Sequence, residues 1–132
     1  FETHLDAGEN PDEPGWFIQW LQAQEAVHAF TFDGAWFDIG TPQSYLDAVA
    51  WYLGGENRVA ESAVVENADL GKNVHVMADA EVRNSSLTDT VVFGNTSIVD
   101  SDIRRSIIDE NTKVENFDLA GALVGAHSRL TK

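Results

Sequence analysis

The chain has 132 residues, enough for one domain or two small units. Its 22 acidic residues outnumber 8 lysines and arginines, and the net charge of −14 disfavours binding to duplex nucleic acid and to anionic membranes. The chain contains no cysteine, which excludes disulfides and thiolate metal sites. No apolar run is nearly as long as a membrane span, which needs about 18 residues. No signal-peptide pattern is present either, so we expect a cytoplasmic protein.

The acidic excess also points to the source of the protein. Strong net charge often accompanies disorder, but a hydrophobic content of 43% argues against disorder here. In high salt the repulsion between carboxylates is screened, because the Debye length falls to about 3 Å at 1 M. We therefore expect a halophilic source, with an ordinary acidic cytosolic protein as the alternative. The acidic positions behind this interpretation are Glu61, Glu66, Asp69, Asp79, Glu81, Asp89, Asp100, Asp102, Asp109, Glu110, Glu115 and Asp118.

The first elements in chain order are a loop and a short helix. Residues 10–15 contain two prolines and a glycine, which predicts a turn-rich loop. Four apolar residues then follow at the spacing of one helix face: Trp16, Phe17, Trp20 and Leu21. The chain opens on Phe1 rather than Met, so we expect a fragment or a processed product.

A β-hairpin is predicted next. Residues 27–32 and 35–39 have the composition of strands, and Asp33-Gly34 between them is the strongest two-residue hairpin signal. A second helix follows, with Thr41 as N-cap and Pro42 at its first position. Gly54 and Gly55 end it. All four tryptophans lie in the first 55 residues, which indicates that these elements pack against something larger.

The second half of the chain repeats with a period of 16 residues. Three tracks of aliphatic residues run through it, and one turn earlier the same tracks continue at a spacing of 17. The tracks are Val59, Val76, Val92, Ile108 and Val124; Val65, Val82, Ile98, Val114 and Leu130; and Leu70, Leu87, Ile103 and Leu119. So short a period with three aliphatic positions predicts a parallel β-solenoid with three sides, in which stacked rungs bury one aliphatic residue per side.

A fourth track holds small residues and predicts a tight corner of the coil. It consists of Ala63, Ala80, Thr96, Thr112 and Ser128. Asn95 and Asn111 precede Thr96 and Thr112, which suggests either an amide ladder or left-handed corner residues. The period does not give the hand of the coil, although parallel crossovers are normally right-handed.

The segment Trp36–Leu46, which reads WFDIGTPQSYL, resembles a motif of sugar-1-phosphate nucleotidylyltransferases, nearest to the glucose-1-phosphate thymidylyltransferase and mannose-1-phosphate guanylyltransferase branches. In that family a strand ending in Trp-x-Asp-x-Gly-Thr precedes a helix beginning Pro-x-x-Tyr-Leu. Many members then continue into a left-handed β-helix of hexapeptide repeats. The resemblance spans residues 14–130. It implies a mainly β fold: a left-handed parallel β-helix over residues 56–132, preceded over residues 1–55 by a small α/β remnant of the catalytic domain.

The family joins a sugar 1-phosphate to a nucleoside triphosphate and releases pyrophosphate. Two aspartates hold Mg²⁺ there, and the second of them matches Asp38. Trp36, Gly40 and Thr41 match further motif positions. The alternative for Asp38 is a turn or capping carboxylate before Gly40. The family's glycine-rich nucleotide loop, first metal aspartate and catalytic lysine have no match in this chain, so we assign no catalytic or nucleotide-binding residue and expect the chain alone to be inactive.

Other functions remain open at this stage. The chain could be a stand-alone oligomerisation module, or a hexapeptide acyltransferase with His75 or His127 as its base. A zinc site needs converging histidines, and these two fall three turns apart. The pair Arg104-Arg105 could read a phosphate effector, although a local charge pair with Asp102 is favoured. We expect a homo-oligomer, because the last rung, residues 124–130, leaves an open sheet edge.

Overall fold

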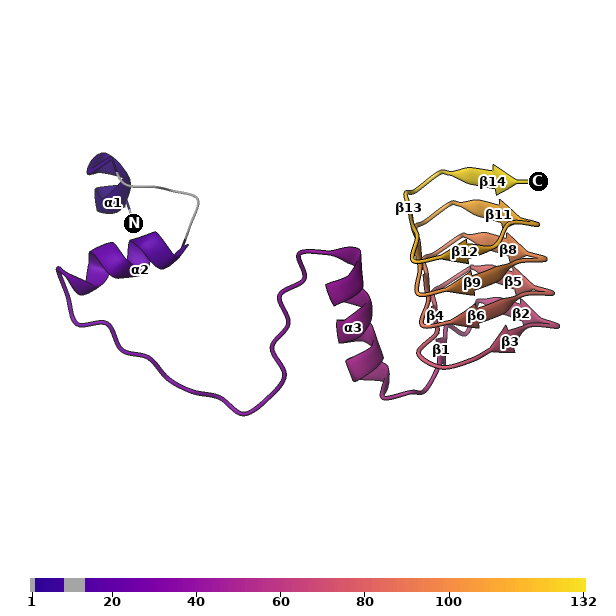
Figure 1. Cartoon of the computed structure of the whole chain (residues 1–132), viewed down its shortest axis with the longest axis horizontal. Helices are drawn as coiled ribbons and strands as arrows, with labels where there is room; N and C mark the ends of the chain where they lie inside the picture. Colours follow the sequence, from indigo (N-terminus) through magenta and orange to yellow (C-terminus); the bar gives the residue numbers. More distant parts are fainter. Residues whose placement is uncertain (1, 9–13) are drawn as a thin grey trace. The chain divides into compact units, whose positions relative to one another are not determined.

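The computed structural model describes residues 2–8 and 14–132 (Figure 1). The chain divides into two compact units, Phe1–Ala35 and Trp36–Lys132. The second unit contains a helix and a parallel β-solenoid, so the predicted solenoid is confirmed.

The first unit contains α1 (Glu2–Asp6) and α2 (Pro14–Gln22). The second of these confirms the predicted short helix, and the rings of Phe17 and Trp20 stack within it with their centroids 6.2 Å apart. Residues 10–13 of the predicted loop lie outside the described residues. Gly15, also assigned to that loop, lies inside α2.

The predicted hairpin is wrong. No residue of segments 27–32 and 35–39 lies in a strand, and both segments are exposed. The exposed fractions of Phe30, Phe32 and Trp36 are 87%, 61% and 74%, so their apolar area is not buried. A two-stranded hairpin is at best marginally stable unless one face packs against another element. The Asp33-Gly34 signal is local and cannot supply that packing surface.

The predicted second helix is confirmed as α3 (Pro42–Leu53). Its N-terminus forms a capping box: the amide of Ser44 donates to Oγ1 of Thr41, and the amide of Thr41 donates to Oγ of Ser44, both at 3.1 Å. Gly54 closes the helix in the left-handed conformation, with φ of 62°, and its amide donates to the carbonyl of Ala50 at 2.9 Å.

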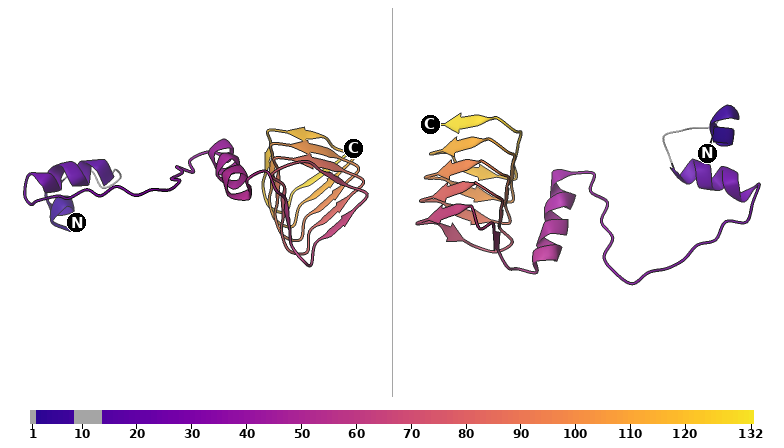
Figure 2. Two further views of the ribbon diagram at one scale, coloured as in Figure 1. Left: turned by 90° about the horizontal axis from the view of Figure 1, so that it is seen from below. Right: turned by 180° about the vertical axis from the view of Figure 1, so that it is seen from behind.

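Three parallel sheets form the sides of the solenoid (Figure 2). Sheet A consists of β1 (Arg58–Val59), β4 (His75–Val76), β7 (Val91–Val92), β10 (Ile107–Ile108) and β13 (Leu123–Val124). Sheet B consists of β2 (Val64–Glu66), β5 (Glu81–Arg83), β8 (Ser97–Val99), β11 (Lys113–Glu115) and β14 (Arg129–Thr131). Sheet C consists of β3 (Asp69–Leu70), β6 (Ser86–Thr88), β9 (Asp102–Arg104) and β12 (Leu119–Ala120).

The three aliphatic tracks fill the interior as predicted, except that Val59 in the first rung is 41% exposed. Val92, Ile98 and Ile108, for example, are completely buried. The pairing register matches the period, since Val76 pairs with Val92 in sheet A. Burial of such a side chain contributes about 1.5–3 kcal/mol, so the tracks supply most of the apolar stabilisation of the solenoid.

The 17-residue spacing of the first turn has a single origin. Leu70 and His75 are five positions apart, whereas their pairing partners Leu87 and Val91 are four apart. One additional residue therefore lies between β3 and β4. Every pairing that crosses this point is offset by 17, as in Arg58 with His75.

The corners consist of left-handed residues, which confirms that interpretation of Asn95 and Asn111. Their φ angles are 56° and 55°. Two further corner columns, which the sequence analysis missed, have the same geometry. The three columns are Asp79, Asn95, Asn111 and His127; Asn67, Asn84, Asp100 and Asn116; and Asn73, Asp89, Arg105 and Gly121. Most are Asn, Asp or Gly, the residues that tolerate this conformation best.

A buried Ser or Thr follows many of these corner residues and joins one rung to the next. The hydroxyl of Ser106 donates to the carbonyl of Arg104 at 2.7 Å and accepts from the amide of Ala122 at 3.1 Å. Thr96 likewise donates to the carbonyl of Asp109 at 2.8 Å and accepts from the amide of Thr112 at 3.3 Å. The small residues at the corners therefore satisfy backbone groups that would otherwise be buried without partners.

Replacing Thr96 by Val tests this role. The substitution keeps the shape of the side chain but leaves a buried carbonyl and a buried amide without their partner. We expect the free energy of unfolding, measured by urea titration, to fall by about 1–3 kcal/mol. Thr131→Val, at an exposed hydroxyl in β14, is the matched control and should change it little. Equal effects of the two substitutions would contradict a stabilising role for the corner hydroxyls.

Candidate functional site

Asp38, the predicted metal ligand, lies in the extended segment that leads into α3. The segment is exposed, and Asp38 has no hydrogen bond or ion pair within the part of the chain that the structure describes. Thr41 and Ser44, rather than Asp38, cap the helix. No group of three or more histidine or acidic residues within residues 2–8 and 14–132 is arranged to hold a metal ion. Asp38 is therefore an available carboxylate without a second ligand nearby.

Aromatic residues connect the motif segment to α3. The ring centroids of Phe37 and Trp51 are 5.6 Å apart, with the ring planes tilted by 59°. Trp36, Ile39, Trp51 and Tyr52 remain 55–74% exposed. Together with Phe37 they form what we call the aromatic strip.

The inner side of α3 packs on the outer face of sheet A. Leu46 forms a buried cluster with Val91 and Ile107, and Tyr45 and Val49 pack against it. The outward-facing residues of sheet A are aliphatic in the second half of the chain. This sheet therefore offers an apolar surface that a helix can cover. The packing joins the motif segment to the solenoid within one compact unit.

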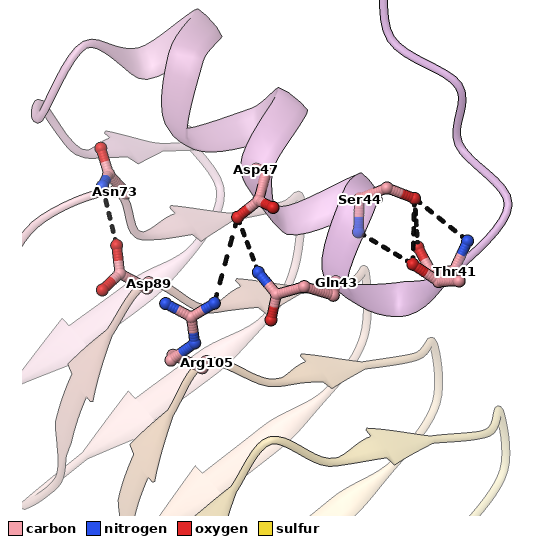
Figure 3. Close-up of polar contacts among 7 residues, drawn as sticks. All are labelled: Thr41, Gln43, Ser44, Asp47, Asn73, Asp89 and Arg105. Carbon is pink, nitrogen blue, oxygen red and sulfur yellow. Dashed lines mark hydrogen bonds and ion pairs between the residues drawn. The ribbon is translucent and has the colours of Figure 1, made fainter.

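A polar cavity of about 220 Å³ lies beside this contact, between α3 and the corner column of Asn73, Asp89 and Arg105 (Figure 3). Oδ1 of Asp47 accepts from Nε2 of Gln43 at 2.6 Å and lies 4.0 Å from Nη2 of Arg105. Nδ2 of Asn73 donates to Oδ1 of Asp89 at 2.7 Å.

The charges around the cavity balance, because two carboxylates face Arg105 and Lys72. Asn73 is buried with both polar ends satisfied, since its Oδ1 also accepts from the amide of Gly55 at 2.9 Å. The cavity contains no nucleophile paired with a base. The arrangement stabilises the docking of α3 and does not resemble a reaction centre. Sequence reasoning missed it, although the 16-residue spacing of Asn73, Asp89 and Arg105 was a usable signal.

The two candidate histidines lie in different surroundings. His75 is in β4, and burial, together with the nearby Arg58 guanidinium, lowers its pKa below the ordinary value. His127 is an exposed corner residue with φ of 61°. His75 lies in the second rung, whereas His127 lies in the fifth rung, between β13 and β14, so the two side chains are three rungs apart. Neither belongs to a metal-binding group among the described residues.

The two adjacent arginines have separate partners. Nε of Arg104 donates to Oδ1 of Asp102 at 3.0 Å, which confirms the predicted local charge pair. The hydrogen bond from Arg104 lowers the pKa of the Asp102 carboxyl. Arg105 instead faces Asp47 on α3.

The comparison of this sequence with models of known protein families found no match. Within the described ranges, no helix has the length and apolar character needed to cross a membrane.

Shortening Leu46 to Ala tests the docking of α3. The substitution removes the side chain at the centre of the buried cluster, and large-to-small changes in cores typically cost about 2–5 kcal/mol. We expect hydrogen exchange of the amides in residues 45–53 to accelerate about tenfold or more, while the amides of β7, β8 and β10 stay protected. Leu123→Ala, the same change at an exposed residue of β13 outside this cluster, should leave exchange of these amides nearly unchanged. Equal acceleration throughout the solenoid would mean that α3 is not a separate docking element.

Proposed function

We propose that this chain is the C-terminal region of a sugar-1-phosphate nucleotidylyltransferase. The observation that carries the proposal is the succession, within one compact unit, of the motif segment, a capped helix and a parallel solenoid. The motif residues Trp36, Gly40 and Thr41 stand in the order found in that family. The proposed reaction joins a nucleoside triphosphate and a sugar 1-phosphate and releases pyrophosphate.

In this proposal Asp38 is one of two carboxylates that hold Mg²⁺. Its exposure and its lack of hydrogen-bond or ion-pair partners in the described chain support this role, since the carboxylate remains available to a cation. One or two carboxylates together with substrate phosphates are the usual protein ligands of Mg²⁺. Bound there, the ion would neutralise charge on the reacting phosphates. The other carboxylate, the nucleotide loop and the catalytic lysine would come from a catalytic domain, and the chain alone would be inactive.

The solenoid would then be the family's left-handed β-helix and would serve assembly or regulation. The resemblance supports that hand. A halophilic source is supported by the net charge of −14, and a cytoplasmic location fits the proposed substrates.

A stand-alone oligomerisation module is the second candidate. The aromatic strip favours it, because so much exposed apolar area needs a covering surface. The acyltransferase alternative, with His75 or His127 as its base, stays a prediction.

Asp38→Asn in the complete polypeptide that contains this chain tests the first proposal. Loss of the carboxylate charge should lower kcat/KM by about 100-fold or more, because changes even in the surroundings of metal ligands cost about 10–100-fold. Raising the Mg²⁺ concentration should recover part of the loss. Asp33→Asn, an exposed aspartate in the preceding segment, is the control and should retain activity.

Two results would contradict the proposal. The first is a complete polypeptide that forms no nucleotide sugar from any pair of nucleoside triphosphate and sugar 1-phosphate, which would favour the oligomerisation module. The second is full activity of the Asp38→Asn variant at every Mg²⁺ concentration.

A further inference from the structure

An open cavity of about 560 Å³ lies on the outer face of sheet A, over its first two rungs. Arg58 and His75 in its lining are paired residues of β1 and β4. Both point outward, because successive residues of a strand point to opposite faces and the residue after each belongs to an interior track. No lining residue belongs to the motif segment, so the cavity is separate in sequence from Asp38.

The cavity exists because one outward column beside sheet A begins with a small residue. Ala60, Met77 and Phe93 occupy equivalent positions on successive rungs, and the amide of each donates to a carbonyl of the next rung at 2.9 Å. The side chains of Met77 and Phe93 pack against the buried cluster beneath α3. The methyl group of Ala60 is too short to fill the corresponding space, so this space stays open on the first rung.

Arg58 is a cation without a carboxylate partner in the described part of the chain. Its Nη1 donates to the hydroxyl of Tyr52 on α3 at 2.9 Å, and no described carboxylate lies within 4.0 Å of its guanidinium. Arg83, Arg104 and Arg105, by contrast, each have a carboxylate within that distance. In a chain of net charge −14, this guanidinium is available to an external anion.

Further polar groups surround Arg58. The hydroxyl of Tyr52 accepts from Arg58, so its own proton can be donated to a ligand. His75 is half-buried, and burial together with the Arg58 guanidinium lowers its pKa, so the imidazole is neutral at pH 7. An anion that offsets the charge of Arg58 would let His75 gain a proton. Glu61, at the corner after β1, is the one carboxylate in the lining and can accept a hydrogen bond from a hydroxyl.

We propose that this cavity binds the phosphate monoester of a small hydroxylated molecule. Arg58, Tyr52 and His75 supply donors from three side chains, which suits the three terminal oxygens of a phosphate better than the two oxygens of a carboxylate. The side chain of Met77 borders the space for the organic part of the ligand. Glu61 accepts from a hydroxyl of that part and, through its charge, disfavours a bare dianion. The ligand binds without the catalytic residues proposed above.

Titration of the 132-residue chain with glycerol 3-phosphate, followed by the amide NMR signals of residues 58–61 and 75–78, tests the proposal. We expect saturable shifts centred on these residues, and tighter binding than with sulfate, which carries about the same charge but no hydroxyl. Arg58→Gln should weaken binding about tenfold or more, because it removes a charge-assisted hydrogen bond. Arg129→Gln, the same change at an exposed arginine of β14, is the matched control and should leave the affinity nearly unchanged.

Two further variants test the cavity and the imidazole separately. Ala60→Met gives the first rung the side chain that Met77 gives the second, and it should abolish binding while the midpoint of urea unfolding is preserved. The charge of sulfate is constant between about pH 5.5 and about pH 8, and sulfate should bind about tenfold more tightly at the lower pH, because binding raises the pKa of His75. His75→Gln keeps a donor but cannot gain a proton, so it should lose this pH dependence.

Several results would overturn the proposal. The first is the absence of saturable shifts in these residues at millimolar glycerol 3-phosphate. Equal weakening by Arg58→Gln and Arg129→Gln would show a response to net charge alone, and unchanged binding to the Ala60→Met variant would place the ligand outside the cavity. Sulfate that binds as tightly as glycerol 3-phosphate would show that the site does not recognise the organic part of an ester.

Discussion

The left-handed corner is the constraint on which the rest of the structure depends. Each turn changes direction three times, and for most residues the conformation required there costs about 1–2 kcal/mol. Asn, Asp and Gly lower that cost, and the hydroxyl that follows, as in Ser106, joins the corner to the next rung. Because a corner recurs every five or six residues, one aliphatic residue per side is enough to fill the interior.

The outward positions of the three sides have different chemistry, although the interior is uniform. Sheet A is aliphatic at Val91 and Ile107 and receives α3. Sheet B carries ion pairs, such as Arg83 with Glu66 at 3.2 Å. Sheet C carries short acidic and hydroxyl side chains, namely Asp69, Ser86 and Asp102. Sheet A is thus suited to packing against another element, whereas sheets B and C are suited to exposure to solvent. The repeat that builds the interior therefore does not determine the chemistry of the outward-facing residues.

The sequence predicted the features that repeat or that depend on local chemistry. The aliphatic tracks stand out because each recurs at least four times, and Thr41 with Pro42 is a strong local cap signal. The hairpin failed because strand propensity and Asp33-Gly34 cannot create the surface that a hairpin must cover. Two corner columns and the contacts of Asp47 were missed, because small and polar residues recur less regularly and α3 docks through tertiary packing. The motif identified Asp38 as a candidate carboxylate, but a motif could not show that no second ligand lies near Asp38 among the described residues.

The single additional residue between β3 and β4 bears on how the chain reaches its native state. Rungs of equal length and similar interior can pair with the wrong neighbour, since a shift by a whole rung still aligns valine with isoleucine. Two contacts occur at the longer connection: a Cβ at Gly71 would lie 2.5 Å from Oγ1 of Thr88, and Oδ1 of Asn57 accepts from the amide of Val74 at 2.9 Å. A rung that paired with the wrong neighbour would lose both contacts. The additional residue between β3 and β4 therefore distinguishes the first turn from the others and disfavours misfolded registers.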